Sequence, residues 1–424
     1  FCISLIFSQL HLILGDVDED GQLNIIDIVR VVEIVLEPGE PGSDHESWAA
    51  DVNADDIINV EDIVMMVGMI LSDIYCNEDQ FGCFTFSLDC CIRTTSHEFE
   101  WEVLHFGEGS DNFIRDAWIF DDGHIWCVGE FHEGGEQYSA KVWDGDSWLN
   151  KKLFRHYQDI IRVIPGIRSM WAFTEEDIWF AAGTVYHYSG SDTLTTMYGE
   201  FAWTPPFYGR IWASSPENIF FADPWDYNIG YYDGNEFTDI DSLTDVPLLD
   251  IWGLENPETN DLTVWTGGWN DNNGETILLA NHGEEWELIS NLNLYPALQD
   301  TISSLVVSFW SSPYSSLYIT TAAGIYKAGH DTQGEAELFY VYPDFSAYIK
   351  SIRGNSDNDI FIAGINGDVR HFNGETWHTY DELRDEDADL LGLEFNGDTV
   401  VMVGWRHPGN GNQGVIIKGV RSGD

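Results

Sequence analysis

Two acidic loops carry the side chains best suited to chemistry, because each repeats oxygen donors at the same spacing. The donors stand at positions 1, 3, 5, 9 and 12 of a twelve-residue loop. In the first loop they are Asp16, Asp18, Asp20, Asn24 and Asp27, and in the second they are Asp51, Asn53, Asp55, Asn59 and Asp62. Position 7 supplies a backbone carbonyl, so Gln22 and Ile57 complete the two sets. Calcium takes roughly six to eight oxygen ligands, and the spacing therefore predicts two Ca²⁺ sites.

Each loop must be held by the apolar helical stretch that follows it. No helix-forming pattern precedes either loop, and position 12 is Asp where ordinary EF-hand loops have Glu. Half an EF-hand, loop then helix, used twice across residues 15–72, resembles the dockerin type I family of bacterial secreted proteins. The resemblance implies a small α-helical domain that binds calcium and a cohesin-like partner. Asp56 stands where the loop usually has Gly for its sharp turn, so we expect the second site to bind calcium more weakly.

The partner surface cannot be carried over from the family. Dockerins often select their cohesin with a small hydroxylated pair at loop positions 10 and 11, whereas this chain has Ile25-Ile26 and Val60-Glu61 there. The helices also show apolar residues at helical spacing: Ile25, Ile28, Val29, Val32, Val35, Ile63, Met66, Val67 and Ile70. We interpret these mainly as the core between the two helices, with a partner-binding face as the alternative.

Composition limits the remaining functions. The 424 residues include 18 Lys+Arg and 73 Asp+Glu, a formal net charge of −55. Nucleic-acid binding is therefore not expected, since the basic footprint that neutralises phosphates is missing. Eighteen Trp, 18 Tyr and 24 Phe argue against disorder, because they offer ample apolar surface to bury. No stretch reaches the ~18 uninterrupted apolar residues of a membrane span.

The first 95 residues contain two further segments. Residues 1–14 form a short apolar run that we interpret as the remnant of a secretory signal peptide, with a peripheral strand or helix as the alternative. Residues 73–95 form a connector with four cysteines, Cys76, Cys83, Cys90 and Cys91. In an exported protein these are expected to form two disulfides of undetermined pairing, with a zinc site as the alternative. Cys127 lies in an apolar strand pattern and is expected to be a buried free thiol.

Residues 96–424 repeat one short pattern. An apolar pair such as Ile-Trp leads through a turn to a second apolar strand, as in Arg210-Ile-Trp-Ala-Ser-Ser-Pro-Glu-Asn-Ile-Phe220. The anchors of the seven copies are Trp118, Trp171, Trp212, Trp252, Trp310, Ile352 and Leu393, at intervals of 40 to 58 residues. A strand-rich period of this length predicts a seven-bladed β-propeller, so the expected fold is mainly β with a small all-α dockerin in front. The pattern resembles bacterial repeat proteins built on Val-Trp-Gly-Ser-Ser-Pro units, a likeness that informs architecture and not activity.

Two details of the propeller follow from the strand count. The last repeat offers only three strands, and we expect residues 99–104 to supply the missing outer strand and so close the ring. The pairs Asp144-Gly145, Asp233-Gly234 and Asn373-Gly374 are expected to form type I′ hairpin turns and to be structural.

Three functions remain open. The first is a secreted or cell-surface protein whose dockerin attaches a glycan-binding or protein-binding propeller in polysaccharide utilisation. The second is a propeller glycoside hydrolase or lyase, which needs two carboxylates; Asp116 and Asp250, each two residues before an anchor Trp, are the candidates. A sialidase would also need an arginine cluster, and Arg168, Arg210 and Arg353 lie near strand starts, with Lys350 beside them. The third is a pure interaction hub that uses exposed loop aromatics such as Trp225, Tyr227 and Trp269.

Overall fold

The computed structural model describes two compact units, Phe1–Thr95 and Ser96–Asp424, which we treat separately. It describes residues 17, 24–36, 49–52, 57–71, 94–157, 159–164, 166–198, 209–224, 228–240, 244–255, 261–270, 275–283, 285–288, 306–311, 316–321, 324–328, 337–341, 348–409 and 411–422. The segments predicted as signal peptide and most of the cysteine connector lie outside these residues, as do Trp225 and Tyr227. None of the helices in the described ranges is long and apolar enough to cross a membrane.

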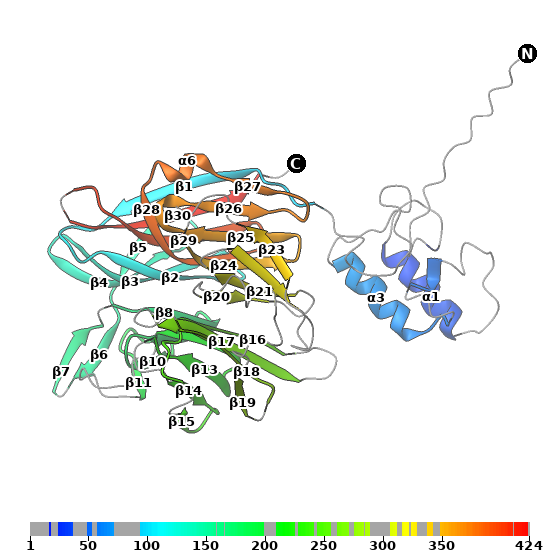
Figure 1. Ribbon diagram of the computed structural model, residues 1–424, viewed down its shortest axis with the longest axis horizontal. Coiled ribbons are helices and arrows are strands. Elements are labelled where there is room, and N and C mark those ends of the chain that lie inside the picture. Colours follow the sequence, from blue (N-terminus) through cyan, green and yellow to red (C-terminus); the bar gives the residue numbers. More distant parts are fainter. Residues whose placement is uncertain are drawn as a thin grey trace, which may run out of the picture. The chain divides into compact units, whose positions relative to one another are not determined.

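In the described part of the first unit, two helices have defined bounds, α1 (Ile25–Leu36) and α3 (Val60–Leu71) (Figure 1). Their shared core includes Ile28 and Val31 of α1 and Met66 of α3, together with Val17 and Val52 from the loops. Each helix begins at position 10 of its loop, so the last loop donors, Asp27 and Asp62, lie in the first helical turn. Packing of the helices therefore places both loop ends next to the core.

The second unit is a seven-bladed β-propeller, with four antiparallel strands in each blade (Figure 1). Blade 1 contains β2 (Phe113–Ile119), β3 (Ile125–Glu133), β4 (Glu136–Trp143) and β5 (Trp148–Lys151). Blade 2 contains β8 (Ser169–Thr174), β9 (Asp177–Ala181), β10 (Val185–Tyr188) and β11 (Thr195–Tyr198). Blade 3 contains β12 (Arg210–Ser215), β13 (Asn218–Ala222), β14 (Ile229–Tyr232) and β15 (Phe237–Ile240). A separate hairpin, β6 (Phe154–Tyr157) and β7 (Ile160–Val163), lies between blades 1 and 2 in the sequence.

The remaining four blades follow the same order. Blade 4 contains β16 (Asp250–Glu255), β17 (Leu262–Asn270), β18 (Glu275–Asn281) and β19 (Trp286–Leu288). Blade 5 contains β20 (Val306–Trp310), β21 (Leu317–Thr321), β22 (Gly324–Ala328) and β23 (Glu337–Val341). Blade 6 contains β24 (Ile349–Ser356), β25 (Asp359–Gly364), β26 (Val369–Phe372) and β27 (Trp377–Thr379). Blade 7 contains β28 (Ala388–Asn396), β29 (Thr399–Arg406), β30 (Gln413–Arg421) and β1 (Phe99–Phe106).

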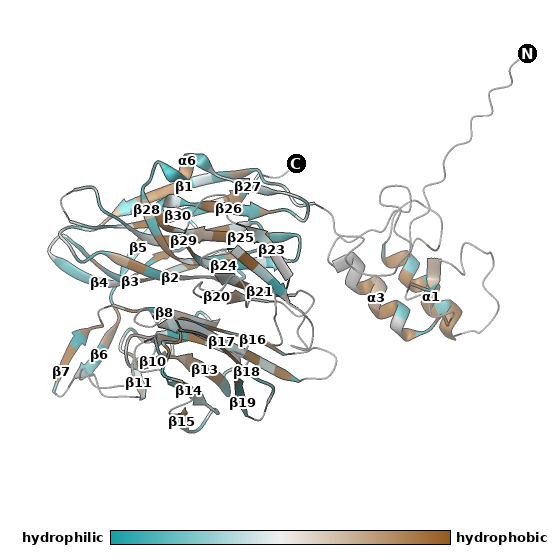
Figure 2. Cartoon of the chain, in the orientation of Figure 1, coloured by the Kyte–Doolittle hydropathy of each residue, from teal (hydrophilic) through white to brown (hydrophobic). Residues whose placement is uncertain are grey.

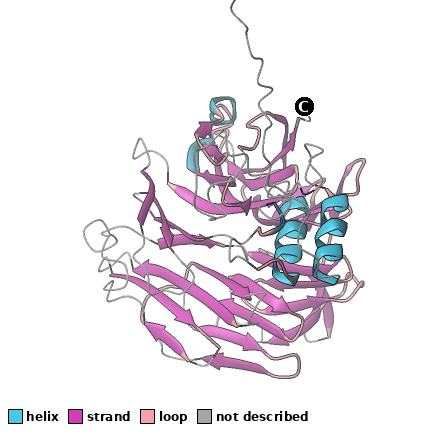
Figure 3. Cartoon of the chain, turned by 90° about the vertical axis from the view of Figure 1, so that its right-hand side faces the viewer, coloured by secondary structure: helices cyan, strands magenta, loops and turns pink. Residues whose placement is uncertain are grey.

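The prediction of seven blades is confirmed, and each predicted anchor lies in the innermost strand of its blade. The second strand is largely apolar in blades 2, 3 and 5, and Figure 2 shows hydrophobic residues along many strands of the propeller. Apolar side chains also pack between neighbouring blades. Between blades 1 and 2, for example, Trp126 and Val128 join Phe180 and Tyr186 in one core cluster. The regular elements of the propeller are strands, apart from the short helices η2 (Ile365–Gly367) and α6 (Asp381–Arg384) (Figure 3). The longer helices α1 and α3 belong to the first unit.

The hairpin turns are structural, but the predicted type I′ conformation is wrong. Only Asn366 and Asp387 among described non-glycine residues have positive φ, so of each turn pair only Gly145, Gly234 and Gly374 take it. The preceding residue instead accepts two backbone N–H groups through its side chain, as Asp144 Oδ1 does from Asp146 at 3.0 Å and Ser147 at 2.8 Å. The side chain thus replaces a backbone acceptor, which removes the need for a second positive φ.

The two ends of the propeller meet in blade 7. β1 pairs with β30 in antiparallel register, from Phe99 opposite Arg421 to Phe106 opposite Gly414. Three strands from the C-terminal end and one from the N-terminal end of this unit therefore share a sheet, which leaves the ring without an open blade.

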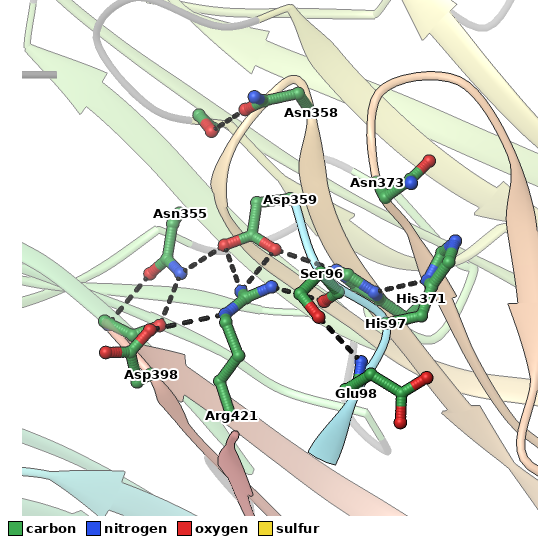
Figure 4. Close-up of polar contacts among 12 residues, drawn as sticks. Ser96, His97, Glu98, Asn355, Asn358, Asp359, His371, Asn373, Asp398 and Arg421 are labelled. Carbon is green, nitrogen blue, oxygen red and sulfur yellow. Dashed lines mark hydrogen bonds and ion pairs between the residues drawn. The ribbon is translucent and has the colours of Figure 1, made fainter. Parts of the chain in front are cut away.

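A polar closure cluster lies where this join meets blade 6 (Figure 4). Arg421 donates to both carboxylate oxygens of Asp359 at 2.7 Å and to the carbonyl of Ser96 at 2.6 Å. His371, which is fully buried, hydrogen-bonds Asp359 Oδ1 at 2.8 Å through Nε2 and His97 at 2.8 Å through Nδ1. The cluster links the chain before β1, the end of β30 and two strands of blade 6.

Candidate functional sites: calcium loops and the propeller channel

The two acidic loops end in the same hydrogen-bonded arrangement. Asp27 accepts the backbone N–H of Val17 at 2.8 Å and that of Asn24 at 2.8 Å. Asp62 accepts the equivalent N–H groups of Val52 at 2.9 Å and Asn59 at 2.8 Å. Both carboxylates are fully buried. The position-12 residue of each loop therefore folds back over its own loop, and the two copies are equivalent in the parts described.

The described donors suit a hard cation. Asn24, Asp27, Asp51, Asn59, Asp62 and the carbonyl of Ile57 offer oxygen only from carboxylate, amide and backbone groups, which are the ligands that Ca²⁺ takes. Asn59 Nδ2 donates to the Ile57 carbonyl at 3.2 Å, which brings positions 7 and 9 of the second loop together. The other predicted ligands, Asp16, Asp18, Asp20, Gln22, Asn53 and Asp55, lie outside the described residues.

The helix faces differ from the prediction in an informative way. Ile28 and Met66 are buried as expected, but Ile25 and Val29 are 64% and 51% exposed and do not belong to the core. The interpretation of Ile25, Val29 and Val67 as core residues is wrong, since each is exposed and none belongs to the core cluster of this unit. Val60 and Val64 occupy the positions of Ile25 and Val29 in the second copy and are 60% and 64% exposed. The two helices thus present equivalent apolar patches.

In the propeller, the seven innermost strands bring one ring of side chains into the central channel. Each ring residue stands two positions before the anchor of its blade: Asp116, Ser169, Arg210, Asp250, Ser308, Lys350 and Leu391. All seven line one cavity of about 60 Å³. Trp118, Trp171 and Trp252 bound the same cavity, and the Trp171 ring lies 4.9 Å from Trp118 and 6.0 Å from Trp252.

The two predicted catalytic candidates, Asp116 and Asp250, both lie in this ring, but each also joins two blades. Asp116 Oδ2 accepts the N–H of Met170 in blade 2 at 2.9 Å. Asp250 Oδ2 accepts the hydroxyl of Ser308 at 2.6 Å and the N–H of Phe309 at 3.0 Å, both in blade 5. Asp250 is 4% exposed. Both carboxylates therefore have a structural role that is sufficient to explain their position.

Glu394 is a channel carboxylate that the sequence reasoning missed. It lies on β28 one residue after Leu393, the anchor of the last repeat. That position was the only feature of the sequence that pointed to Glu394, and the anchor there is Leu where five other repeats have Trp. Burial raises the pKa of Glu394 to about 8, with the nearby Asp116 carboxylate adding to the rise and Arg353 opposing it. Arg353 Nε lies 3.8 Å from Glu394 Oε2, and the side chain of Glu394 is 21% exposed. Burial also raises the pKa of Asp116.

The channel cations reach across blade boundaries as well. Arg210 donates to the carbonyl of Arg168 in the preceding blade at 3.3 Å, and its Nε lies 3.9 Å from Asp250 Oδ1. Arg353 donates to the carbonyl of Phe309 in blade 5 at 3.2 Å and stacks over the Trp252 ring at 4.4 Å. The structure thus brings together the basic residues that the sequence placed near strand starts.

Metal-capable side chains outside the loops gather at one surface position among the described residues. Asp122 and His124 lie in the β2–β3 turn, Glu175 lies in the β8–β9 turn, and one ligand atom from each lies within 4.8 Å of the others. His124 Nδ1 already contacts both carboxylates, and these contacts raise its pKa through the hydrogen bond to Glu175. Ion pairing explains the cluster without a metal ion.

Comparison with known proteins agrees with this division of the chain. Residues 14–71 match the family described as the dockerin type I domain. No curated protein matches the chain. The solved structure of YCF48 bound to D1 peptide is 14% identical with a TM-score of 0.54, covering 78% of this chain and all of that one.

Two further solved structures share the architecture. The extracellular domain of the putative one component system BT4673 from B. thetaiotaomicron is 12% identical with a TM-score of 0.51, covering 75% of this chain and 40% of that one. The WD40 β-propeller domain of Doa1 is 13% identical with a TM-score of 0.51, covering 76% of this chain and 96% of that one. At these identities the likeness concerns the fold alone.

Proposed function

Because residues 14–71 form a dockerin type I domain and the rest of the chain folds as a seven-bladed propeller, we propose that this protein is secreted and attached through its dockerin to a cohesin-bearing scaffold or cell surface. There the propeller binds glycan during polysaccharide utilisation. The dockerin match is the observation that carries the attachment. Dockerin modules occur on extracellular cellulosome components, and type I dockerins bind Ca²⁺.

Calcium binding supports attachment because the loops position the helices. Asp27 and Asp62 lie in the first turns of α1 and α3, so ligands drawn onto an ion also orient the helix starts. We propose two Ca²⁺ sites with the twelve ligands predicted from the sequence. Since metal binding in small domains is coupled to folding, removal of calcium is expected to abolish docking.

The exposed apolar residues of the helices are the proposed contact surface for the cohesin-like partner. Ile25 and Val29 in one copy correspond to Val60 and Val64 in the other, and all four are more than half exposed. Exposed apolar groups of this kind mark interaction sites when they form a contiguous patch. Their apolar character suits a partner that offers an apolar surface rather than hydroxyl acceptors.

For the propeller, the size of the channel cavity favours binding over hydrolysis. Pockets that enclose a small ligand usually measure roughly 300–1,000 Å³, whereas this cavity measures about 60 Å³. A glycosidase must place the bond between two sugar rings between its carboxylates, and such a substrate does not fit here. The cavity accommodates a single functional group of a ligand whose rings remain outside.

A hydrolase or lyase is the second candidate, and one observation favours it. Glu394 has a pKa of about 8 and lies near Asp116, which is the arrangement of a protonated acid beside a second carboxylate. In this alternative Glu394 is the general acid, with Asp116 or Asp250 as its partner.

One set of experiments tests both parts. The full chain is passed over immobilised cohesin modules with calcium and with EGTA, and is then applied to a glycan array and to a polysaccharide hydrolysis screen. We expect calcium-dependent capture and glycan retention without product release. Ile25→Lys combined with Val60→Lys is expected to lose capture, whereas Ile160→Lys, an exposed apolar residue of the propeller, retains it. Released sugar that disappears in Glu394→Gln would overturn the binding function in favour of the hydrolase.

A further inference from the structure

Positive charge is concentrated at the channel of this strongly acidic protein. The chain has 18 Lys+Arg against 73 Asp+Glu, yet five of the basic residues lie on or directly before innermost strands. They are Arg115 of β2, Arg168 before β8, Arg210 of β12, and Lys350 and Arg353 of β24. Arg210, Lys350 and Arg353 line the cavity itself.

These cations face one another as much as they face acids. Burial, together with the positive charges of Arg115 and Arg210, lowers the pKa of Arg168 to about 10. Burial is also the main cause that lowers the pKa of Arg115 and of Lys350, and Arg210 contributes to both. Arg210 is therefore the centre of a group of four like charges.

Acidic residues surround this group, but two of the four cations, Arg115 and Lys350, are not in ion-pair contact with any of them among the described residues. Glu130, Asp223 and Asp389 act on Arg115, Arg168 and Lys350 respectively, while Asp250 lies 3.9 Å from Arg210. Within the described part of the chain, neither Arg115 nor Lys350 forms an ion pair. Arg115 donates to the carbonyl of Phe113 at 3.4 Å, and the Lys350 ammonium lies 3.9 Å from the centre of the Tyr348 ring.

Partly buried like charges raise the free energy of the empty site, and a bound anion lowers it. We propose that Arg210 and Lys350, supported by Arg115 and Arg168, bind the carboxylate of a uronic acid at the end of an otherwise neutral glycan. The inference rests on the proposed glycan-binding function and names both the site and the class of sugar. A carboxylate fits a cavity of about 60 Å³ whereas a sugar ring does not.

The rest of the cavity wall favours a sugar acid over other anions. Ser169 and Ser308 stand on the same ring as the cations. The Ser308 hydroxyl already donates to Asp250, so its oxygen is left to accept a sugar hydroxyl, and the Asp116 carboxylate is a second acceptor. A polyanion is disfavoured, because three carboxylates line the cavity and the whole chain carries a net charge of −55.

Isothermal titration calorimetry on the full chain with calcium tests the proposal. The probes are aldobiouronic acids that end in glucuronate or galacturonate. Each is compared with two ligands, its neutral parent disaccharide and the 6-sulfate of that disaccharide. We expect at least one uronate to bind about tenfold or more tightly than its neutral parent, the value of one charge-assisted hydrogen bond. Arg210→Gln and Lys350→Gln are each expected to lose about tenfold in affinity for that uronate.

The matched control is Lys152→Gln, which removes the same charge from a surface pair with Glu136 at 2.8 Å and should bind like the wild type. Arg210→Gln could fail to fold, because the hydrogen bond from Arg210 to the Arg168 carbonyl joins two blades. In that case Lys350→Gln decides the question, since the Lys350 side chain makes no hydrogen bond to a described residue. Unchanged affinity in Lys350→Gln, equal binding of a uronate and its parent, or tighter binding of the sulfate overturns the proposal. Neutral glycans that bind independently of Arg210 and Lys350 would leave the proposed function standing and remove this inference, whereas a lack of any glycan binding removes both.

Discussion

Replacement of Arg421 by Gln should destabilise the propeller by breaking the closure cluster. The guanidinium is 12% exposed and donates to Asp359, whose side chain is 7% exposed, while also bonding the carbonyl of Ser96. Removal of one partner from a buried ion pair usually costs about 3–5 kcal/mol. Asp359 retains hydrogen bonds from His371 and Asn355, so we expect the lower end, about 3 kcal/mol.

The size of the propeller sets the expected thermal shift. An unfolding entropy of about 2.1 cal/mol/K per residue, over roughly 330 residues, converts 3 kcal/mol into a Tm decrease of about 4 °C. Tryptophan fluorescence and calorimetry of the full chain with calcium should both show it. Lys152→Gln, which breaks a pair with the 63% exposed Glu136, serves as the surface control and should leave the Tm unchanged.

A double-mutant cycle separates the ion pair from the other losses. Asp359→Asn combined with Arg421→Gln should cost at least about 1 kcal/mol less than the sum of the two single changes, because the second change no longer leaves a charge unpaired. The reasoning is refuted if Arg421→Gln stays within about 0.5 kcal/mol of the wild type, or if the two changes are additive.

Three further predictions concern pH and calcium. Burial, with the charges of His371 and His378, lowers the pKa of His97 to about 4, below the value of about 6.5 in the unfolded chain. The free energy of unfolding should therefore fall as the pH drops from 6.5 toward 4. Urea unfolding at a series of pH values should show a smaller fall in His97→Gln. The pKa of Glu394, which faces Arg353 and Asp116, is raised in the folded protein, so the folded state loses stability as the pH rises toward 8. The stability difference between Glu394→Gln and the wild type, measured by urea unfolding, should therefore be roughly 2–3 kcal/mol larger in favour of the variant at about pH 9 than at about pH 6. An equal difference at the two pH values would contradict the assignment. Asp56→Gly should strengthen calcium binding at the second loop by about 1 kcal/mol, measured by titration of the calcium-free protein, and unchanged affinity would show that position 56 does not need positive φ.

Patterns that are local in the chain allowed most of the architecture to be predicted. The loop donors are separated by at most eleven residues, so their spacing alone predicts a calcium loop, and the order of turn and helix carries the family resemblance. Each blade likewise forms from one contiguous stretch, with blade 7 as the exception, so seven copies of the Ile-Trp pattern predict seven blades. Exposure was harder to predict, since apolar residues at helical spacing include both the buried Ile28 and the exposed Ile25.

The channel was decided by the tertiary structure. Asp116, Arg210 and Lys350 come from three blades, and only closure of the ring determines that they share one small cavity. Closure in turn brings Ser96 to Arg421, from opposite ends of this unit, by hydrogen bonds that no local pattern encodes. The sequence alone therefore determined the spacing of the loop donors and the number of blades, because both depend on near neighbours in the chain. The pairing of charges, the size of the channel and the pKa of Glu394 depend on distances between remote residues, and these exist only in the closed ring.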